Sequence, residues 1–170
     1  RASKTIEVDV ISDNRYLGRT SAPSGASVGK YESVSFPKGG PKESLRILNE
    51  NSKKFLGLES SDLKSIDETL KSIDMTPNYS KIGGGLAYAI TIASMESASK
   101  AVEKQLFELI SKQNEYRFPI PIGNILGGGA HAGPGTPDIQ EILISAPGAK
   151  TIRDAIETNF KVHNELRNVI

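Results

Sequence analysis

The sequence has no cysteine and no tryptophan, and neither sign of charge predominates among its 170 residues. The absence of cysteine excludes a disulfide scaffold and a cysteine-ligated zinc or iron–sulfur site, and it is typical of the reducing cytoplasm. With 21 basic against 20 acidic residues, the chain lacks the basic excess that binding to nucleic-acid phosphates requires. The longest apolar-leaning stretch, residues 86–95, is far too short to span a bilayer. We therefore expect a cytoplasmic protein that has neither nucleic acid nor a membrane as its partner.

The sequence begins with Arg1 instead of an initiator methionine and is strand-like by Thr5, so we expect no signal peptide. We expect the chain to be a piece of a longer protein, cut at its front. Its length suits one ordinary core or two small ones, and it is too short for a large barrel enzyme.

The amino-terminal part predicts strands followed by helices. Residues 5–10 alternate apolar and polar side chains, residues 16–22 can return beside them as a hairpin, and residues 31–36 are expected to form a third strand. Farther along, apolar residues recur at helical spacing. That spacing predicts a helix from Pro41 to Gly57 and a second one after a cap at Ser60 or Ser61. Between residues 86 and 112 it predicts a buried helix followed by a more amphipathic one.

The last third of the chain has a different pattern. Residues 118–126 form a short apolar run, a glycine-rich loop follows, and residues 139–146 predict a second strand. A turn then leads to a helix that Thr151 caps. This order of strand, loop, strand and helix is typical of the start of a larger sheet or barrel.

The first candidate site, called the serine loop below, is Ser24-Gly25-Ala26-Ser27-Val28-Gly29-Lys30. Its glycines expose backbone N–H groups as phosphate-binding loops do. It is not a P-loop, because its glycine spacing is one residue short and Tyr31 stands where a magnesium-binding Ser or Thr is required. Two interpretations remain. The loop closes over a ligand and offers serine oxygens to a hard cation, or it is an ordinary connection between strands.

A second glycine-rich loop contains His131, one of only two histidines. Such a histidine can hydrogen-bond a phosphate or move a proton, or it can be a solvent-exposed residue of a turn. The strand that follows carries Gln140 and Glu141 among isoleucines, and one of these two side chains is expected to point inward. A buried carboxylate is costly unless it is paired, so Glu141 either serves a site or forms a salt bridge with a lysine.

Taken together, these motifs resemble the enolase family in order and spacing. The resemblance is carried by the serine loop with Glu32 after it, by Gly128-Gly129-Ala130-His131-Ala132-Gly133, and by Gln140-Glu141. Residues 5–10 resemble the first strand of the enolase amino-terminal domain, and residues 163–170 resemble the first helix of its barrel. The residues around His131 are similar to those of archaeal members, and the resemblance covers the whole chain.

The resemblance implies an α+β fold in which residues 1–116 form the enolase capping domain, a three-stranded meander plus a helical bundle. Residues 117–170 would begin the α/β barrel in the order β-β-α. The implied activity is that of enolase (phosphopyruvate hydratase), a lyase of glycolysis and gluconeogenesis that reversibly dehydrates 2-phospho-D-glycerate to phosphoenolpyruvate. Two Mg²⁺ ions would stabilise an ene-diolate. The resemblance also implies a homodimer or a larger homo-oligomer.

By the same resemblance, Ser27 caps the second Mg²⁺ through its hydroxyl and backbone carbonyl. It lies in the family's mobile loop, here Ser24, Gly25, Ala26 and Ser27. His131 lies close to the substrate and takes part in catalysis and binding. Glu141 is the catalytic carboxylate that holds the acid/base network around the leaving hydroxyl, with Gln140 beside it as a substrate-binding residue.

The resemblance also implies that this segment is inactive alone, because the family's three metal carboxylates and its general-base lysine lie beyond residue 170. The sequence departs from the family at several positions, among them Gly83-Gly84-Gly85-Leu86-Ala87 in place of Gly-Ala-Asn-Ala. Two alternatives therefore stand beside enolase. One is a divergent lyase or racemase of the enolase superfamily with another substrate, and the other is a non-catalytic capping or assembly domain.

Overall fold

The computed structural model describes residues 3–23, 25, 28–111, 113, 115–129 and 132–170. The chain divides into two compact units, Arg1–Gln113 and Asn114–Ile170, and each is described by itself below. No helix in these described ranges is both long enough and apolar enough to cross a membrane.

The first unit begins with a hairpin of two antiparallel strands, β1 (Glu7–Ser12) and β2 (Tyr16–Ser21). The register pairs Glu7 with Ser21 and Ser12 with Tyr16. Asp13 and Asn14 in the connecting turn have a φ of 52°, a left-handed conformation that these two residue types tolerate well. The hairpin that the alternating pattern predicts is therefore confirmed.

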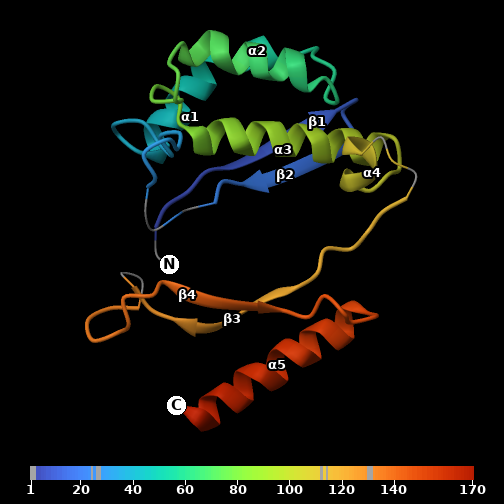
Figure 1. The fold of residues 1–170 in the computed structure, drawn as a ribbon. Coiled ribbons are helices and arrows are strands. Elements are labelled where there is room, and N and C mark those ends of the chain that lie inside the picture. Colours follow the sequence, from blue (N-terminus) through green and yellow to red (C-terminus); the bar gives the residue numbers. More distant parts are fainter. Residues whose placement is uncertain (1–2, 24, 26–27, 112, 114, 130–131) are drawn as a thin grey trace. The chain divides into compact units, whose positions relative to one another are not determined.

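The other regular elements in the described part of this unit are helices, joined by loops (Figure 1). They are α1 (Pro41–Asn51), the short 3-10 helix η1 (Ser52–Phe55), α2 (Leu63–Asp74), α3 (Gly84–Ala101) and α4 (Leu106–Ile110). Pro41 lies at the start of α1, where its missing N–H costs nothing. The helix predicted from Pro41 onward is confirmed as α1 and η1.

The core of the first unit is built around α3, which lies between the β1–β2 hairpin and α2 (Figure 1). Ala89 and Ala93 are fully buried, and Leu86 is 1% exposed. Small side chains let the hairpin approach the helix closely. A Cβ atom on Gly18 would lie 1.9 Å from the carbonyl oxygen of Ala93. The aliphatic side chains of α2, chiefly Ile66 and Leu70, pack in the same core cluster.

Residues 31–36 do not form the predicted third strand. Their backbone groups are used elsewhere: the N–H of Val34 donates to the carbonyl of Asn78 at 2.9 Å, and the N–H groups of Gly84 and Gly85 donate to the carbonyls of Val34 and Ser35. The hydrogen bonds that a strand would need for its ladder therefore hold this segment against the start of α3. The described part of this unit contains a two-stranded sheet instead of a three-stranded meander.

Two helix boundaries also differ from the prediction. The cap of α2 is Asp62, whose carboxylate accepts hydrogen bonds from the N–H groups of Lys64 and Ser65, and not Ser60 or Ser61. The amphipathic helix expected to reach residue 112 is only the five-residue α4. Glu103, with a φ of 54°, interrupts the helical path between α3 and α4.

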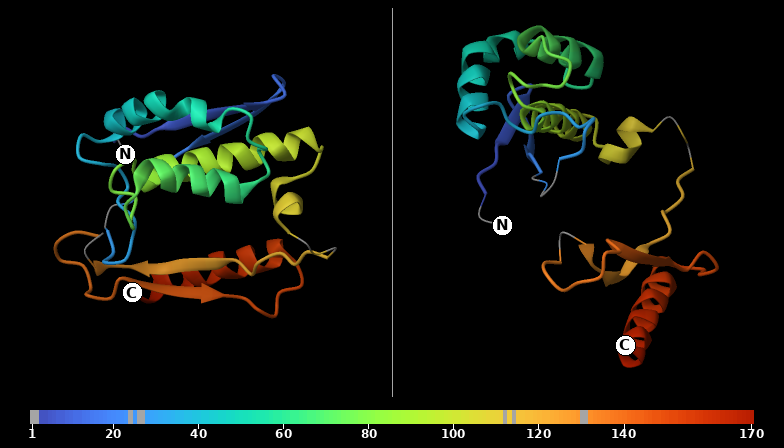
Figure 2. Two further views of the ribbon diagram at one scale, coloured as in Figure 1. Left: turned by 90° about the horizontal axis from the view of Figure 1, so that it is seen from above. Right: turned by 60° about the vertical axis from the view of Figure 1, so that its left-hand side comes forward.

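The second unit contains the antiparallel strands β3 (Ile122–Gly127) and β4 (Glu141–Ser145), followed by α5 (Ile152–Val169). The hydroxyl of Thr151 caps α5 by accepting a hydrogen bond from the N–H of Asp154 at 3.1 Å. Helix α5 lies along one face of the β3–β4 hairpin (Figure 2). The predicted order of two strands and a helix, with its cap at Thr151, is confirmed.

Candidate functional site

The predicted site residues belong to a loop of the first unit and to a loop and a strand of the second. Ser24, Ala26, Ser27 and His131 lie outside the described residues. The structure describes the other three, Gly25, Gln140 and Glu141, and all three are exposed.

The β3–β4 hairpin brings Glu141 to the same end as the loop that contains His131. Glu141 is the first residue of β4 and pairs with Gly127, the last residue of β3. In an antiparallel hairpin the end of one strand lies beside the start of the next. The loop that follows β3 therefore begins and ends next to Glu141.

Backbone hydrogen bonds close the base of this loop. The N–H of Gly128 donates to the carbonyl of Gln140 at 2.8 Å, and the N–H of Gly129 donates to the carbonyl of Pro137 at 2.7 Å. A Cβ atom on Gly128 would lie 2.5 Å from the carbonyl oxygens of Pro137 and Ile139. Glycine is thus required at position 128. The backbone carbonyl of Gln140 helps to close the loop, and its side chain is exposed.

The side chains of the hairpin divide between two faces. Gly123 lies against Asn159 of α5, and Ile144 pairs with Gly123, so both face the helix. Alternation along the strands then places Asn124, Leu143 and Glu141 on the opposite face. The Nδ2 of Asn124 donates to the Oε2 of Glu141 at 3.4 Å, which agrees with this arrangement.

The face that carries Glu141 is uncovered within the second unit. Ile122 is 68% exposed and Leu143 is 48% exposed. Glu141 and Gln140 are exposed as well, so the expected inward orientation of one of them is not seen within this unit. The physical reason is that a single helix covers only one face of a two-stranded sheet.

Asn124 is a candidate site residue that sequence reasoning missed. Its side-chain amide donates to the carboxylate of Glu141, and it stands in a strand whose other side chains are mostly apolar. A lone amide within an apolar strand, just before a glycine-rich loop, was the signal that could have found it. The described residues contain no group of three or more His, Cys, Asp or Glu that could hold a metal ion.

The serine loop is anchored on both sides by buried or hydrogen-bonded backbone. On its amino-terminal side, Ala22 is 4% exposed, donates its N–H to the carbonyl of Ile6 at 2.9 Å and accepts from the hydroxyl of Thr5 at 2.7 Å. On its carboxy-terminal side, the backbone of Val34 is bonded to Asn78 and Gly84. Both anchors belong to the first unit.

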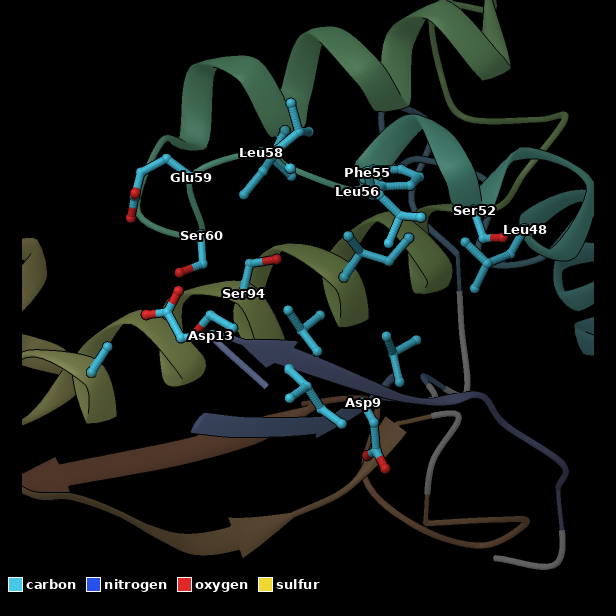
Figure 3. A pocket seen from close by; sticks show the side chains of 18 of the residues that line it. Asp9, Asp13, Leu48, Ser52, Phe55, Leu56, Leu58, Glu59, Ser60 and Ser94 are labelled. Atoms are coloured by element: carbon cyan, nitrogen blue, oxygen red, sulfur yellow. The ribbon is translucent and has the colours of Figure 1, made fainter. Parts of the chain in front are cut away.

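A cavity of about 620 Å³ opens beside β1, between η1, the loop that follows it and α3 (Figure 3). Leu56 and Leu58 of that loop line one side, and Asp13, Ser60 and Ser94 lie near one another at one end. Gly25, Gln140 and Glu141 do not line this cavity. This cavity belongs to the first unit and is separate from the described candidate residues.

Two family models match the chain in succession. The enolase N-terminal domain matches residues 1–110, and the enolase C-terminal TIM barrel domain matches residues 115–170. The chain belongs to the enolase family. This confirms the resemblance and the predicted fold class, an α+β enolase amino-terminal domain followed by the start of the barrel.

Curated relatives named enolase agree with this assignment. The enolase of Methanosphaera stadtmanae is 40% identical over 168 residues, which cover 98% of this chain and 40% of that protein. The enolase of Methanothermobacter thermautotrophicus is 39% identical over 171 residues, which cover 100% of this chain and 41% of that protein. The enolase of Halobacterium salinarum is 35% identical, with 99% and 42% covered. The chain thus spans about two fifths of the length of these enolase relatives.

Proposed function

We propose that this chain is the amino-terminal part of an enzyme that reversibly removes water from 2-phosphoglycerate to give phosphoenolpyruvate. The observation that carries the proposal is the match of both units to consecutive enolase domains, together with the common end of the hairpin where Glu141 meets the loop of His131. The segment alone lacks most of a barrel and is expected to be inactive.

The two faces of the β3–β4 hairpin support a catalytic position for Glu141. In a barrel of strands and helices the helices lie outside, and the active site lies at the carboxyl ends of the strands. Helix α5 covers the face that carries Gly123, so the face that carries Glu141 would turn toward the barrel interior. Glu141 also lies beside the carboxyl end of β3. Both features agree with a site that opens at that end.

We assign the residues the following roles. Glu141 holds the proton network around the hydroxyl that leaves, and Asn124 orients its carboxylate. His131 hydrogen-bonds the substrate and takes part in proton transfer, and Gln140 contributes to substrate binding. Ser27 is a ligand of Mg²⁺.

The residues of this chain fit Mg²⁺ in kind. Mg²⁺ prefers oxygen ligands, which the serine hydroxyl, the carboxylate and the amide oxygen of these side chains provide. They do not suffice in number, since the described residues contain no cluster of three acidic or histidine side chains. We infer that the remaining ligands belong to the rest of the barrel. When bound, Mg²⁺ would supply positive charge beside the substrate carboxylate.

We further propose a cytoplasmic protein that assembles as a homodimer or a larger homo-oligomer. Membership of the enolase family supports both statements, and the absence of cysteine agrees with the reducing cytoplasm.

The full-length protein tests the proposed function directly. We expect it to form phosphoenolpyruvate from 2-phosphoglycerate in the presence of Mg²⁺ and to lose this activity when Mg²⁺ is chelated. Residues 1–170 alone should form none. A full-length protein that is silent on 2-phosphoglycerate but acts on another carboxylic acid would contradict the proposal and favour a different lyase or racemase of the superfamily.

A further inference from the structure

The start of helix α3 is capped by the backbone of a distant segment. The first N–H groups of a helix have no partner within the helix, and a side chain usually accepts from one of them. In α3 the N-cap is Gly83, which has no side chain to do this. Instead, the N–H of Gly84 donates to the carbonyl of Val34 at 2.7 Å, and the N–H of Gly85 donates to the carbonyl of Ser35 at 2.9 Å.

Glycine at positions 84 and 85 makes this close contact possible. A Cβ atom on Gly84 would lie 2.4 Å from the Oγ of Ser33. A Cβ atom on Gly85 would lie 3.0 Å from the carbonyl oxygen of Ser35 and from the ring of Phe36. At position 84 the side chain of Ser33 could turn away, whereas a Cβ atom at position 85 would require residues 35 and 36 to shift.

Residues 33–36 have a second contact, with residues 75–82, and Asp74, which is 1% exposed, holds that stretch in place. One carboxylate oxygen of Asp74 accepts from the N–H and the hydroxyl of Thr76, and the other accepts from the N–H groups of Lys81 and Ile82, at 3.0 and 2.7 Å. These bonds fix the path of residues 75–82. The carbonyl of Asn78 in this stretch accepts from the N–H of Val34 at 2.9 Å.

We propose that Asp74 and the glycines at positions 84 and 85 are positioning residues for the metal ligand Ser27. They fix residues 33–36, which form the carboxy-terminal anchor of the serine loop, and thereby set how readily Ser27 meets Mg²⁺. The inference rests on the proposed function, because it takes Ser27 as a ligand. None of the three residues needs to touch substrate or metal.

Kinetics of the full-length enzyme test the proposal with two variants that disturb the anchor from different sides. Gly85→Ala adds the obstructing Cβ atom, and Asp74→Asn replaces one accepting oxygen with an amide that faces N–H donors. We expect each to raise the Mg²⁺ concentration for half-maximal activity by about threefold to tenfold, because a less populated binding geometry lowers apparent affinity in proportion. Gly148→Ala is the matched control, since its Cβ atom meets nothing within 4 Å.

A purely structural role would give a different result. It would lower the amount of active enzyme and leave the Mg²⁺ midpoint where it is in the wild type. For Gly85→Ala, helix propensity alone would even favour the variant, because alanine is the better helix former. An unchanged midpoint in both variants, alongside a raised midpoint in Ser27→Ala, would overturn the positioning role and leave the proposed function intact. An inactive wild-type enzyme would instead contradict the proposed function.

Amide hydrogen exchange supplies a readout that does not depend on activity. In Asp74→Asn we expect the N–H groups of Val34, Gly84 and Gly85 to exchange at least about tenfold faster than in the wild type, while amides in the middle of α3 keep their protection. Unchanged exchange at these three positions would refute the proposal. If Asp74→Asn does not fold, Thr76→Val leaves Asp74 in place and removes the hydroxyl that donates to Asp74 and accepts from the N–H of Ser80. The same result is expected with a smaller change.

Discussion

In the described part of the chain, the carboxylate of Glu141 accepts a hydrogen bond from the amide of Asn124 at 3.4 Å. Its proposed task is to hold protons around the leaving hydroxyl, for which an ionised carboxylate is essential and a neutral amide of the same shape is not sufficient. In the full-length enzyme, Glu141→Gln should therefore reduce kcat by about 10²-fold to 10⁴-fold. Steady-state kinetics measure this, with Glu157→Gln on the exposed side of α5 as an isosteric control. Comparable losses in both variants would show that the effect does not belong to the site.

Asp74 predicts a pH dependence of stability. Burial opposes its charge, but hydrogen bonds from Thr76, Ile82 and Lys81 outweigh that effect and hold the pKa of its carboxyl below the ordinary value. A carboxyl with a lowered pKa in the folded state contributes stability above its unfolded pKa, and this contribution is lost as the pH falls through the folded pKa. The free energy of unfolding of residues 1–170 should thus decrease below about pH 4.

Chemical denaturation at a series of pH values checks this expectation. Asp74→Asn should be less stable than the wild type at neutral pH, and the difference should shrink as the pH approaches the folded pKa of Asp74. A difference that stays constant from neutral to acidic pH would show that the charge of Asp74 does not contribute to stability.

At the scale of elements, the β1–β2 hairpin and α3 are joined at a place where only glycine fits. A Cβ atom on Gly18 would lie 1.9 Å from a backbone oxygen of α3, and a backbone atom cannot rotate away as a side chain can. We expect Gly18→Ala to lower the free energy of unfolding by about 3 kcal/mol or more, because the two elements must move apart. Thermal or denaturant unfolding measures this against Gly148→Ala. Equal stability of the two variants would mean that the hairpin can shift along the helix at no cost.

The elements that could be predicted from the sequence are those whose signals are local. The alternation in residues 5–10 predicted β1, and the caps Pro41 and Thr151 marked the starts of α1 and α5. The prediction of a third strand was wrong because residues 31–36 use their backbone carbonyls to cap α3, which is about 50 positions away in the chain. No residue type in the segment itself signals this. The glycines at the start of α3 are the only trace of it, and they have meaning only once the two segments are known to touch.

At the scale of the whole molecule, the candidate site could be recognised from the order and spacing of its motifs but could not be assembled. The serine loop belongs to the first unit, and the loop of His131 with Glu141 belongs to the second. Each motif alone had an ordinary structural explanation, and only their combination indicated an enolase. The orientation of Glu141 could not be predicted from its neighbours in the sequence. The alternation along a strand shows which side chains share a face, but not which face a later part of the protein will cover.

The uncovered face of β3–β4 leads to a prediction for the isolated chain. Ile122 and Leu143 are exposed there. Among the described residues of the second unit, only Ala155 has a buried apolar side chain. The first unit, by contrast, buries aliphatic side chains from β1, α2 and α3 in one cluster. Because protection follows the burial of apolar contacts, amides of α3 in residues 1–170 should exchange far more slowly than those of β3 and β4. In the full-length protein, further strands and helices would cover this face and the difference should largely disappear. If β3 and β4 of the isolated chain were as strongly protected as α3, the second unit would be stable without the rest of a barrel. That result would favour a capping or assembly domain that functions alone.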